Sequence, residues 1–105
     1  METLQFAYRN GRPVAGSPSA TLTGVVGSGN LEVLVEPAEL GGACRIEILT
    51  AAVGFGQIWQ AVLDDFFARH PLADVRISIN DVGATPAVVS LRLDQAIESF
   101  TGAQP

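Results

Sequence analysis

Few side chains in this 105-residue sequence can do chemistry, and one serine stands apart from the rest. Ser28 lies between Gly27 and Gly29 in "GVVGSGNLEVLVEP", and strand-like apolar segments flank it on both sides. A turn needs its glycines but not this hydroxyl, and no neighbouring side chain would activate it as a nucleophile. Because neither neighbour carries a side chain, the hydroxyl is sterically open. Such an open hydroxyl suits an attachment point that another enzyme modifies.

Two other interpretations of the stretch around Ser28 stay open. Glycine, serine and asparagine dominate turns for local backbone reasons, so Ser28 is also consistent with an ordinary turn residue. A glycine-rich loop can also hold a phosphate with its backbone amides. Such loops usually begin a helix, whose dipole supports the anion, whereas "NLEVLVE" follows here and is typical of a strand.

Residues for catalysis or metal binding are scarce. His70 and Cys44 are the single members of their types, and no pair of carboxylates has the spacing of a metal loop. His70 precedes the helix-ending Pro71, where an imidazole suits the negative end of a helix dipole. Cys44 lies in an expected strand as a small apolar residue. We therefore expect no catalytic set and no metal site.

The charged residues exclude further classes of function. All six basic residues are arginines, so lysine Schiff bases, phosphate-loop lysines and lysine-linked biotin or lipoyl groups are excluded. The net charge of −5 repels phosphate backbones, and we expect no nucleic-acid binding. An acidic surface instead predicts partner proteins with basic docking patches, which speed encounter.

The apolar residues are distributed as in a folded, water-soluble domain. No apolar run approaches the ~20 residues needed to span a bilayer, so no membrane association is expected. The start, "METLQFAYRN", lacks the basic and apolar segments of a secretory signal. With a single cysteine, the sequence predicts a cytoplasmic protein. Its length predicts one domain over residues 1–105.

Hydrophobic periodicity predicts an α+β fold. Alternating apolar residues indicate strands, and spacings of three and four indicate a long amphipathic helix over 54–70, whose Trp59, Phe66 and Phe67 we expect in the core rather than in a ligand platform. Residues 94–100 predict a short C-terminal helix with Asp94 as its N-cap. We expect a mostly antiparallel β-sheet with both helices packed on one face. The strands are expected at 4–9, 20–26, 31–36, 44–49, 75–80 and 87–93.

The loop "INDVGATP" is a second, weaker candidate for a binding site. Asn80, Asp81 and Thr85 are polar residues in a connection, where function often resides. These residue types favour the alternative, a hairpin turn held by hydrogen bonds from an Asx side chain to the nearby backbone.

Three stretches together resemble a known family: "VVGSGNLEVLVEP", "VGFGQIWQAVLDDFFARHP" and "INDVGATPAVVSLRLDQA". The sequence is similar to the acyl carrier (delta) subunit of bacterial malonate decarboxylase. The resemblance implies that Ser28 bears phosphoribosyl-dephospho-coenzyme A through a phosphodiester, attached by a prosthetic-group transferase. It implies that the arm's thiol carries acetyl and malonyl groups, and that Ser28 is an anchor without catalytic duty.

The resemblance also implies partners. A transferase (alpha) subunit would exchange acetyl for malonyl, and decarboxylase (beta and gamma) subunits would remove carbon dioxide. The alternative from another class is a noncovalent scaffold or interaction subunit of a multi-subunit enzyme, in which Ser28 is only a turn residue. A stand-alone enzyme is the third alternative, and the residues give it the least support.

Overall fold

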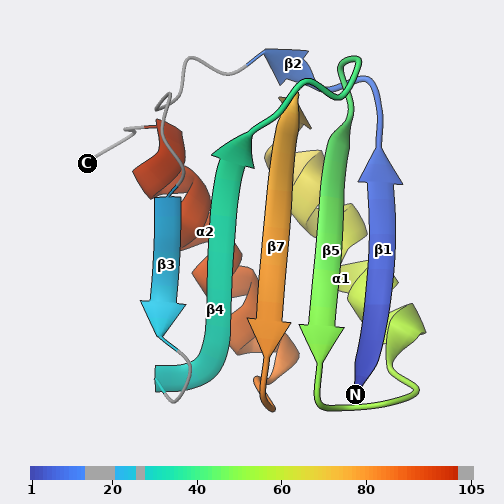
Figure 1. Ribbon diagram of the computed structural model, residues 1–105, viewed down its shortest axis with the longest axis vertical. Helices are drawn as coiled ribbons and strands as arrows, with labels where there is room; N and C mark the ends of the chain where they lie inside the picture. Colours follow the sequence, from blue (N-terminus) through green and yellow to red (C-terminus); the bar gives the residue numbers. More distant parts are fainter. Residues whose placement is uncertain (14–20, 26–27, 102–105) are drawn as a thin grey trace.

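The computed structural model describes residues 1–13, 21–25 and 28–101, and for residues 21–25 and 28–30 it describes the backbone alone. A five-stranded sheet forms one layer and two helices form the other (Figure 1). The order of the strands in the sheet is β1-β5-β7-β4-β3, and β2 and β6 form a separate two-stranded pair. The elements are β1 Glu2–Tyr8, β2 Arg12–Pro13, β3 Thr21–Val25, β4 Ser28–Pro37, β5 Cys44–Thr50, α1 Gly56–Arg69, β6 Leu72–Ala73, β7 Val75–Asp81 and α2 Pro86–Thr101.

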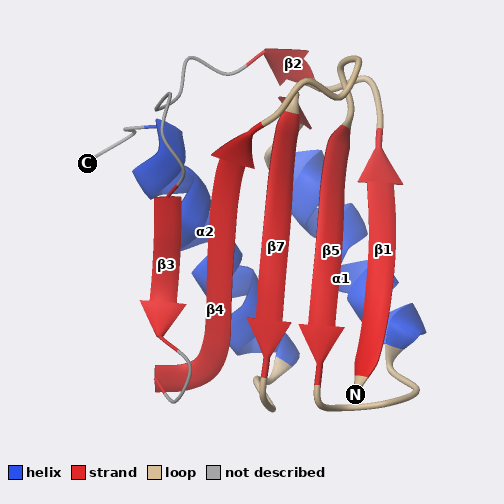
Figure 2. Ribbon diagram, viewed as in Figure 1, coloured by secondary structure: helices blue, strands red, loops and turns tan. Residues whose placement is uncertain are grey.

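Alternating apolar residues build the central strands, as predicted. Buried and exposed residues alternate along β5 without exception, and they alternate along β7 in the same way with partly buried residues on its outer side. Successive side chains of a strand point to opposite faces, so each strand contributes one apolar row to the core. Both helices cover that face (Figure 2), which confirms the prediction of helices on one face of the sheet.

The sheet is mixed, which corrects the expectation of a mostly antiparallel one. β5 pairs with β7 in parallel, with Ile46 opposite Ile77, while β1, β4 and β3 join by antiparallel pairing. The parallel pair arises because α1 lies between β5 and β7 in the chain and returns the chain to the same end of the sheet. Sequence periodicity reports which residues are buried, not the direction of the neighbouring strand.

Helix α1 forms the part of the helical layer on the β1 side of the sheet, while α2 covers β4 and β3 (Figure 1). Trp59, Leu63 and Phe66 are buried on its inner face, and Phe67 is partly buried with its ring stacked on Tyr8 at 4.8 Å between centroids. The prediction of core aromatic residues is therefore confirmed. The helix ends at Arg69, before Pro71, as expected.

Helix α2 contradicts two predictions for the C-terminal region. Residues 87–93 were expected as a strand and 94–100 as a short helix, but one continuous 16-residue helix spans Pro86–Thr101. Its buried residues recur at helical spacing and not at alternate positions, and Leu91, which alternation placed inside, is 59% exposed. Asp94 lies within the helix and accepts hydrogen bonds from Arg69 instead of capping a new helix. The buried set is Val89, Leu93, Ala96, Ile97 and Phe100.

Burial is concentrated between the sheet and the helices. Leu31, Val33 and Val35 from β4 face Leu93 and Ile97 of α2 within one continuous cluster. In the described segments, no helix has the length and apolar character needed to cross a membrane.

Candidate functional site: the start of strand β4

Ser28 is the first residue of β4, at the start of the second strand of a hairpin. Val25 of β3 pairs with Ser28, whereas Thr23 pairs with Val33, so the register shifts between these two pairs. The predicted hairpin is confirmed, but its connection is shorter than the expected "GSGN", because Ser28 and Gly29 already belong to the strand. Gly27 lies outside the described residues. The exposure of the Ser28 hydroxyl stays a prediction.

The first residues of β4 extend past the neighbouring strand. Pairing of β4 with β7 begins with Leu31 opposite Asp81, so residues 28–30 lie beyond the end of that ladder. β4 also bends at its start, away from the direction of the sheet (Figure 1). A backbone in this position is reached from more directions than a strand paired on both sides. The arrangement fits a serine that a second enzyme must reach.

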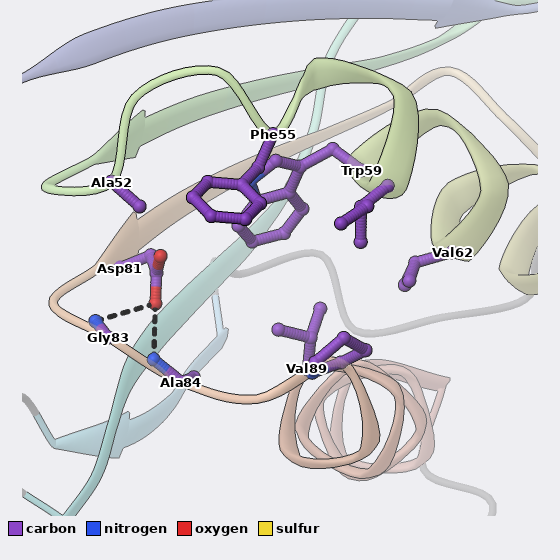
Figure 3. A pocket seen from close by; sticks show the side chains of 10 residues that line it. Ala52, Phe55, Trp59, Val62, Asp81, Gly83, Ala84 and Val89 are labelled. Carbon is purple, nitrogen blue, oxygen red and sulfur yellow. Dashed lines mark hydrogen bonds between the residues drawn. The ribbon is translucent and has the colours of Figure 1, made fainter.

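Asp81, from the second candidate loop, is a buried structural residue. Its Oδ1 accepts hydrogen bonds from the backbone N–H groups of Gly83 (3.1 Å) and Ala84 (2.8 Å) (Figure 3). Its Oδ2 accepts one from the Thr50 hydroxyl (2.8 Å). Only 3% of Asp81 is exposed. These bonds hold the turn after β7, which is the Asx-type turn considered as the alternative for this loop.

The side chains of Asn80 and Thr85 do not join Asp81 in one site, because each has different surroundings. Asn80 alternates with Asp81 along β7 and therefore belongs to the opposite face of the sheet, between Glu32 and Leu49 in the ladder. The Thr85 hydroxyl accepts a hydrogen bond from the Val88 N–H at 3.3 Å, which is an N-cap of α2. The structure does not bring the three residues together, and a contact of any of them with a prosthetic group stays a prediction.

An apolar cavity that the sequence patterns did not indicate lies between the N-terminal ends of the two helices. Its volume is about 180 Å³. Phe55, Trp59 and Val62 approach it from the α1 side and Val89 from α2, while the turn at Asp81 closes one end (Figure 3). Phe55 and Ile58 at its wall are 45% and 47% exposed. Both belong to the apolar series at helical spacing that predicts the helix, so the sequence alone does not distinguish them from the buried residues.

The cysteine and the histidine of the chain both have structural surroundings: Cys44 is buried, and His70 contacts Asp94. Cys44 is fully buried, and burial raises the pKa of its thiol to about 12. His70 lies at the C-terminal end of α1, as predicted, and its Nε2 is 3.1 Å from Asp94 Oδ1, which also accepts from Arg69. Over residues 1–13, 21–25 and 28–101, no three histidine, cysteine or acidic residues lie close enough together to hold a metal ion.

Comparison with protein families gives a match over most of the chain. The family model described as "Malonate decarboxylase delta subunit (MdcD)" matches residues 19–100, which include the start of β4 and both helices.

Individual relatives agree with the family match. A protein from Xanthomonas euvesicatoria named malonate decarboxylase acyl carrier protein is 68% identical over 103 residues, covering 98% of each chain. One of the same name from Stenotrophomonas maltophilia is 59% identical over 105 residues, covering 100% of this chain and 99% of its own.

A solved structure has the same fold. A chain in the crystal structure of a Pseudomonas malonate decarboxylase hetero-tetramer in complex with malonate superposes with a TM-score of 0.79 and 39% sequence identity. The match covers 93% of this chain and 97% of that one.

Proposed function

The chain belongs to the malonate decarboxylase delta-subunit family of acyl carrier proteins, and from that premise we propose that Ser28 is its covalent attachment site. The group attached is phosphoribosyl-dephospho-coenzyme A, joined to the serine oxygen by a phosphodiester. Its terminal thiol supplies the thioester chemistry, carrying acetyl and malonyl groups. Ser28, flanked by Gly27 and Gly29, is the anchor.

The observation that carries this proposal is the place of Ser28 at the start of β4. Residues 28–30 lie beyond the ladder with β7, on a strand whose next residues, Leu31 and Val33, are fully buried. The proposed anchor is therefore the first residue of a strand whose continuation is held in the core. Gly29 adds no side chain beside the anchor, which leaves room for the maturation enzyme.

The chain itself contributes binding and positioning, and we assign no catalytic step to its residues. Cys44 is buried with a raised pKa, and His70 is engaged by Asp94. The partners proposed are the transferase (alpha) and decarboxylase (beta and gamma) subunits, with a prosthetic-group transferase that loads Ser28. The solved relative from Pseudomonas is part of a hetero-tetramer, which supports an assembly of this kind.

Intact mass of the protein purified from its native host tests the attachment. We expect the mass to exceed the sequence mass by one arm and peptide mapping to place the increment on Ser28. Ser28→Ala should remove the increment and abolish malonate decarboxylation by the assembled complex. Ser99→Ala, an exposed serine on α2, is the matched control and should keep both. Full turnover by Ser28→Ala would contradict the proposal and favour the noncovalent scaffold.

A thiol assay gives a second, independent readout. The chain has one cysteine, Cys44, and it is fully buried, so the folded polypeptide without an arm should show no rapidly reacting thiol. The loaded protein should show one equivalent that reacts rapidly, because the arm ends in an exposed thiol. Absence of that equivalent in protein from the native host would count against a thiol-bearing arm.

A further inference from the structure

We propose that the apolar cavity between the N-terminal ends of α1 and α2 binds the adenine ring of the arm. The inference rests on the attachment proposed for Ser28 and goes beyond it by giving the arm a resting place on its own carrier. Three observations bear on this assignment: the apolar lining of the cavity, the carboxylate of Asp81 in its wall, and the short distance from the cavity to the start of β4.

The lining suits a flat, weakly polar ring. The cavity of about 180 Å³ is lined mainly by apolar side chains, including the aromatic rings of Phe55 and Trp59 (Figure 3). Aromatic side chains are the usual partners of nucleic-acid bases, which stack on them irrespective of sequence. Phe55 and Ile58 are about half exposed at the wall, and exposed apolar side chains grouped around a hollow mark binding surfaces.

The carboxylate of Asp81 selects for a part of the arm that donates hydrogen bonds and carries no negative charge. A carboxylate offers about four lone-pair positions, and three donors contact this one: the Thr50 hydroxyl and the N–H groups of Gly83 and Ala84. One acceptor position remains, and the exocyclic amine of adenine is a donor. The same carboxylate repels the phosphates of the arm and the free carboxylate of a malonyl group.

The β4–β7 ladder brings the anchor close to the cavity. Asp81 in the cavity wall pairs with Leu31, three residues from Ser28. Three residues of strand span about 10 Å, and neighbouring strands lie about 5 Å apart. The start of β4 and the carboxyl ends of β5 and β7 occupy the same end of the molecule (Figure 1). Adenine is the first base or chain segment that follows the linking phosphate and sugars of the arm, whereas the pantetheine segment lies farther from the attachment.

Binding the base, rather than the thiol end, is compatible with the carrier's work. With adenine in the cavity, the pantetheine segment and its thiol stay free to reach partner subunits. The bound base also shortens the free part of the arm, so the thiol samples a smaller volume and its effective concentration at a docked partner rises.

Trp59 provides the test, because it is the one tryptophan of the chain and lines the cavity. The Ser28→Ala protein, which cannot be loaded, is titrated with free dephospho-coenzyme A while Trp59 fluorescence is recorded. We expect a saturable change, absent with pantetheine, which lacks the base. Ala84→Phe, which fills the cavity, should weaken binding about tenfold or more. Ala87→Phe, an exposed position in the same helix end and outside the lining, should leave it unchanged.

Loaded protein separates this inference from the proposed function. If mass spectrometry finds the arm on Ser28 while Trp59 emission is identical in loaded and unloaded protein, the attachment stands and the cavity assignment is overturned. A response to pantetheine equal to that of dephospho-coenzyme A would likewise overturn it, by placing the thiol end in the cavity. Absence of the arm from native protein would refute the attachment, and the titration of Ser28→Ala would still report whether the cavity binds the base. Should Ala84→Phe fail to fold, Phe55→Ser at the half-exposed wall replaces it, with Leu91→Ser as its control.

Discussion

Asp81 is one side chain that both holds the turn after β7 and lines the cavity. It is almost fully buried, yet all the partners recorded for its carboxylate are neutral donors from the chain itself. Hydrogen bonds to a carboxylate are stronger than those between neutral groups, because the acceptor is charged. The Thr50 hydroxyl is also buried and would lack a partner without this acceptor. Gly83, at φ +114°, allows the backbone to turn toward this carboxylate.

Replacing Asp81 with alanine should lower the free energy of unfolding by about 2–3 kcal/mol, because the buried Thr50 hydroxyl and two backbone N–H groups lose their acceptor. Urea titration followed by circular dichroism measures the change. Asn80→Ala, at the adjacent position on the uncovered face, is the control and should change stability by less than about 0.5 kcal/mol. Equal losses for the two variants would refute the role assigned to Asp81.

Cys44 predicts a loss of stability in alkali. Its pKa is raised from 9.0 to about 12 by burial, so between these values the unfolded chain has released a proton that the folded chain retains. Stability is therefore full below about pH 9 and falls as the pH rises toward 12, by at most about 1.4 kcal/mol per pH unit. Burial, and then the bond to Asp64, raises the pKa of Tyr8 as well, which adds to the loss.

The contribution of Cys44 can be isolated with Cys44→Ala. Urea unfolding at intervals from pH 8 to pH 11 should show a flatter decline for this variant than for the unchanged chain. The offset between the two curves at pH 8 reports the lost packing, and only the difference in slope reports the thiol. Parallel curves would show that Cys44 does not titrate on unfolding.

At the level of elements, α2 shows where periodicity misleads. The sequence "AVVSLRL" alternates over a few residues and contains adjacent valines, so it resembles a strand. Over a longer window, Val89, Leu93, Ala96, Ile97 and Phe100 follow the helical period, and Thr85-Pro86 is the typical N-cap and first residue of a helix. A window that began at the cap would have found the helix.

Thr85→Ala tests the assignment of this cap. Loss of the hydroxyl leaves the Val88 N–H without its acceptor and should destabilise the protein by about 1 kcal/mol. Thr85→Ser keeps an acceptor in place and should restore most of the loss, as measured by the urea midpoint. If the Thr85→Ser protein had the same urea midpoint as the Thr85→Ala protein, the capping role of the hydroxyl would be excluded.

The longer elements were predictable because their burial follows a single period, whereas the two-residue strands β2 and β6 are too short to show a period and were not predicted. β1, β5, β7 and α1 each alternate or repeat without interruption, and their bounds agree with the patterns to within a few residues. The direction of β5 relative to β7 was not predictable, because it depends on the path of the chain through α1. The cavity depends on two segments, Phe55 to Trp59 and Asp81 to Val89, that are separated in the chain by most of α1 and by β7, and no local pattern brings these together.

At the level of the whole molecule, net charge governs how the carrier meets its partners. With a formal net charge of −5, encounter with basic docking surfaces should be accelerated by long-range attraction. Stopped-flow association with the partner subunits should slow by about tenfold or more between low salt and ~0.5 M salt. The dissociation rate should change much less, and an association rate independent of salt would contradict electrostatic steering.

The position of β4 in the sheet has a consequence for biosynthesis. In the sheet order, β4 has β3 on one side and β7 on the other, and β7 is the last strand of the chain to emerge from the ribosome. An isolated two-stranded hairpin is marginally stable in water. Ser28 is thus set in its native surroundings only once residue 81 has left the ribosome and β7 can pair with β4. If Ser28 is the attachment site proposed above, we expect loading to follow completed folding, so that the arm is joined to carriers whose sheet is already assembled.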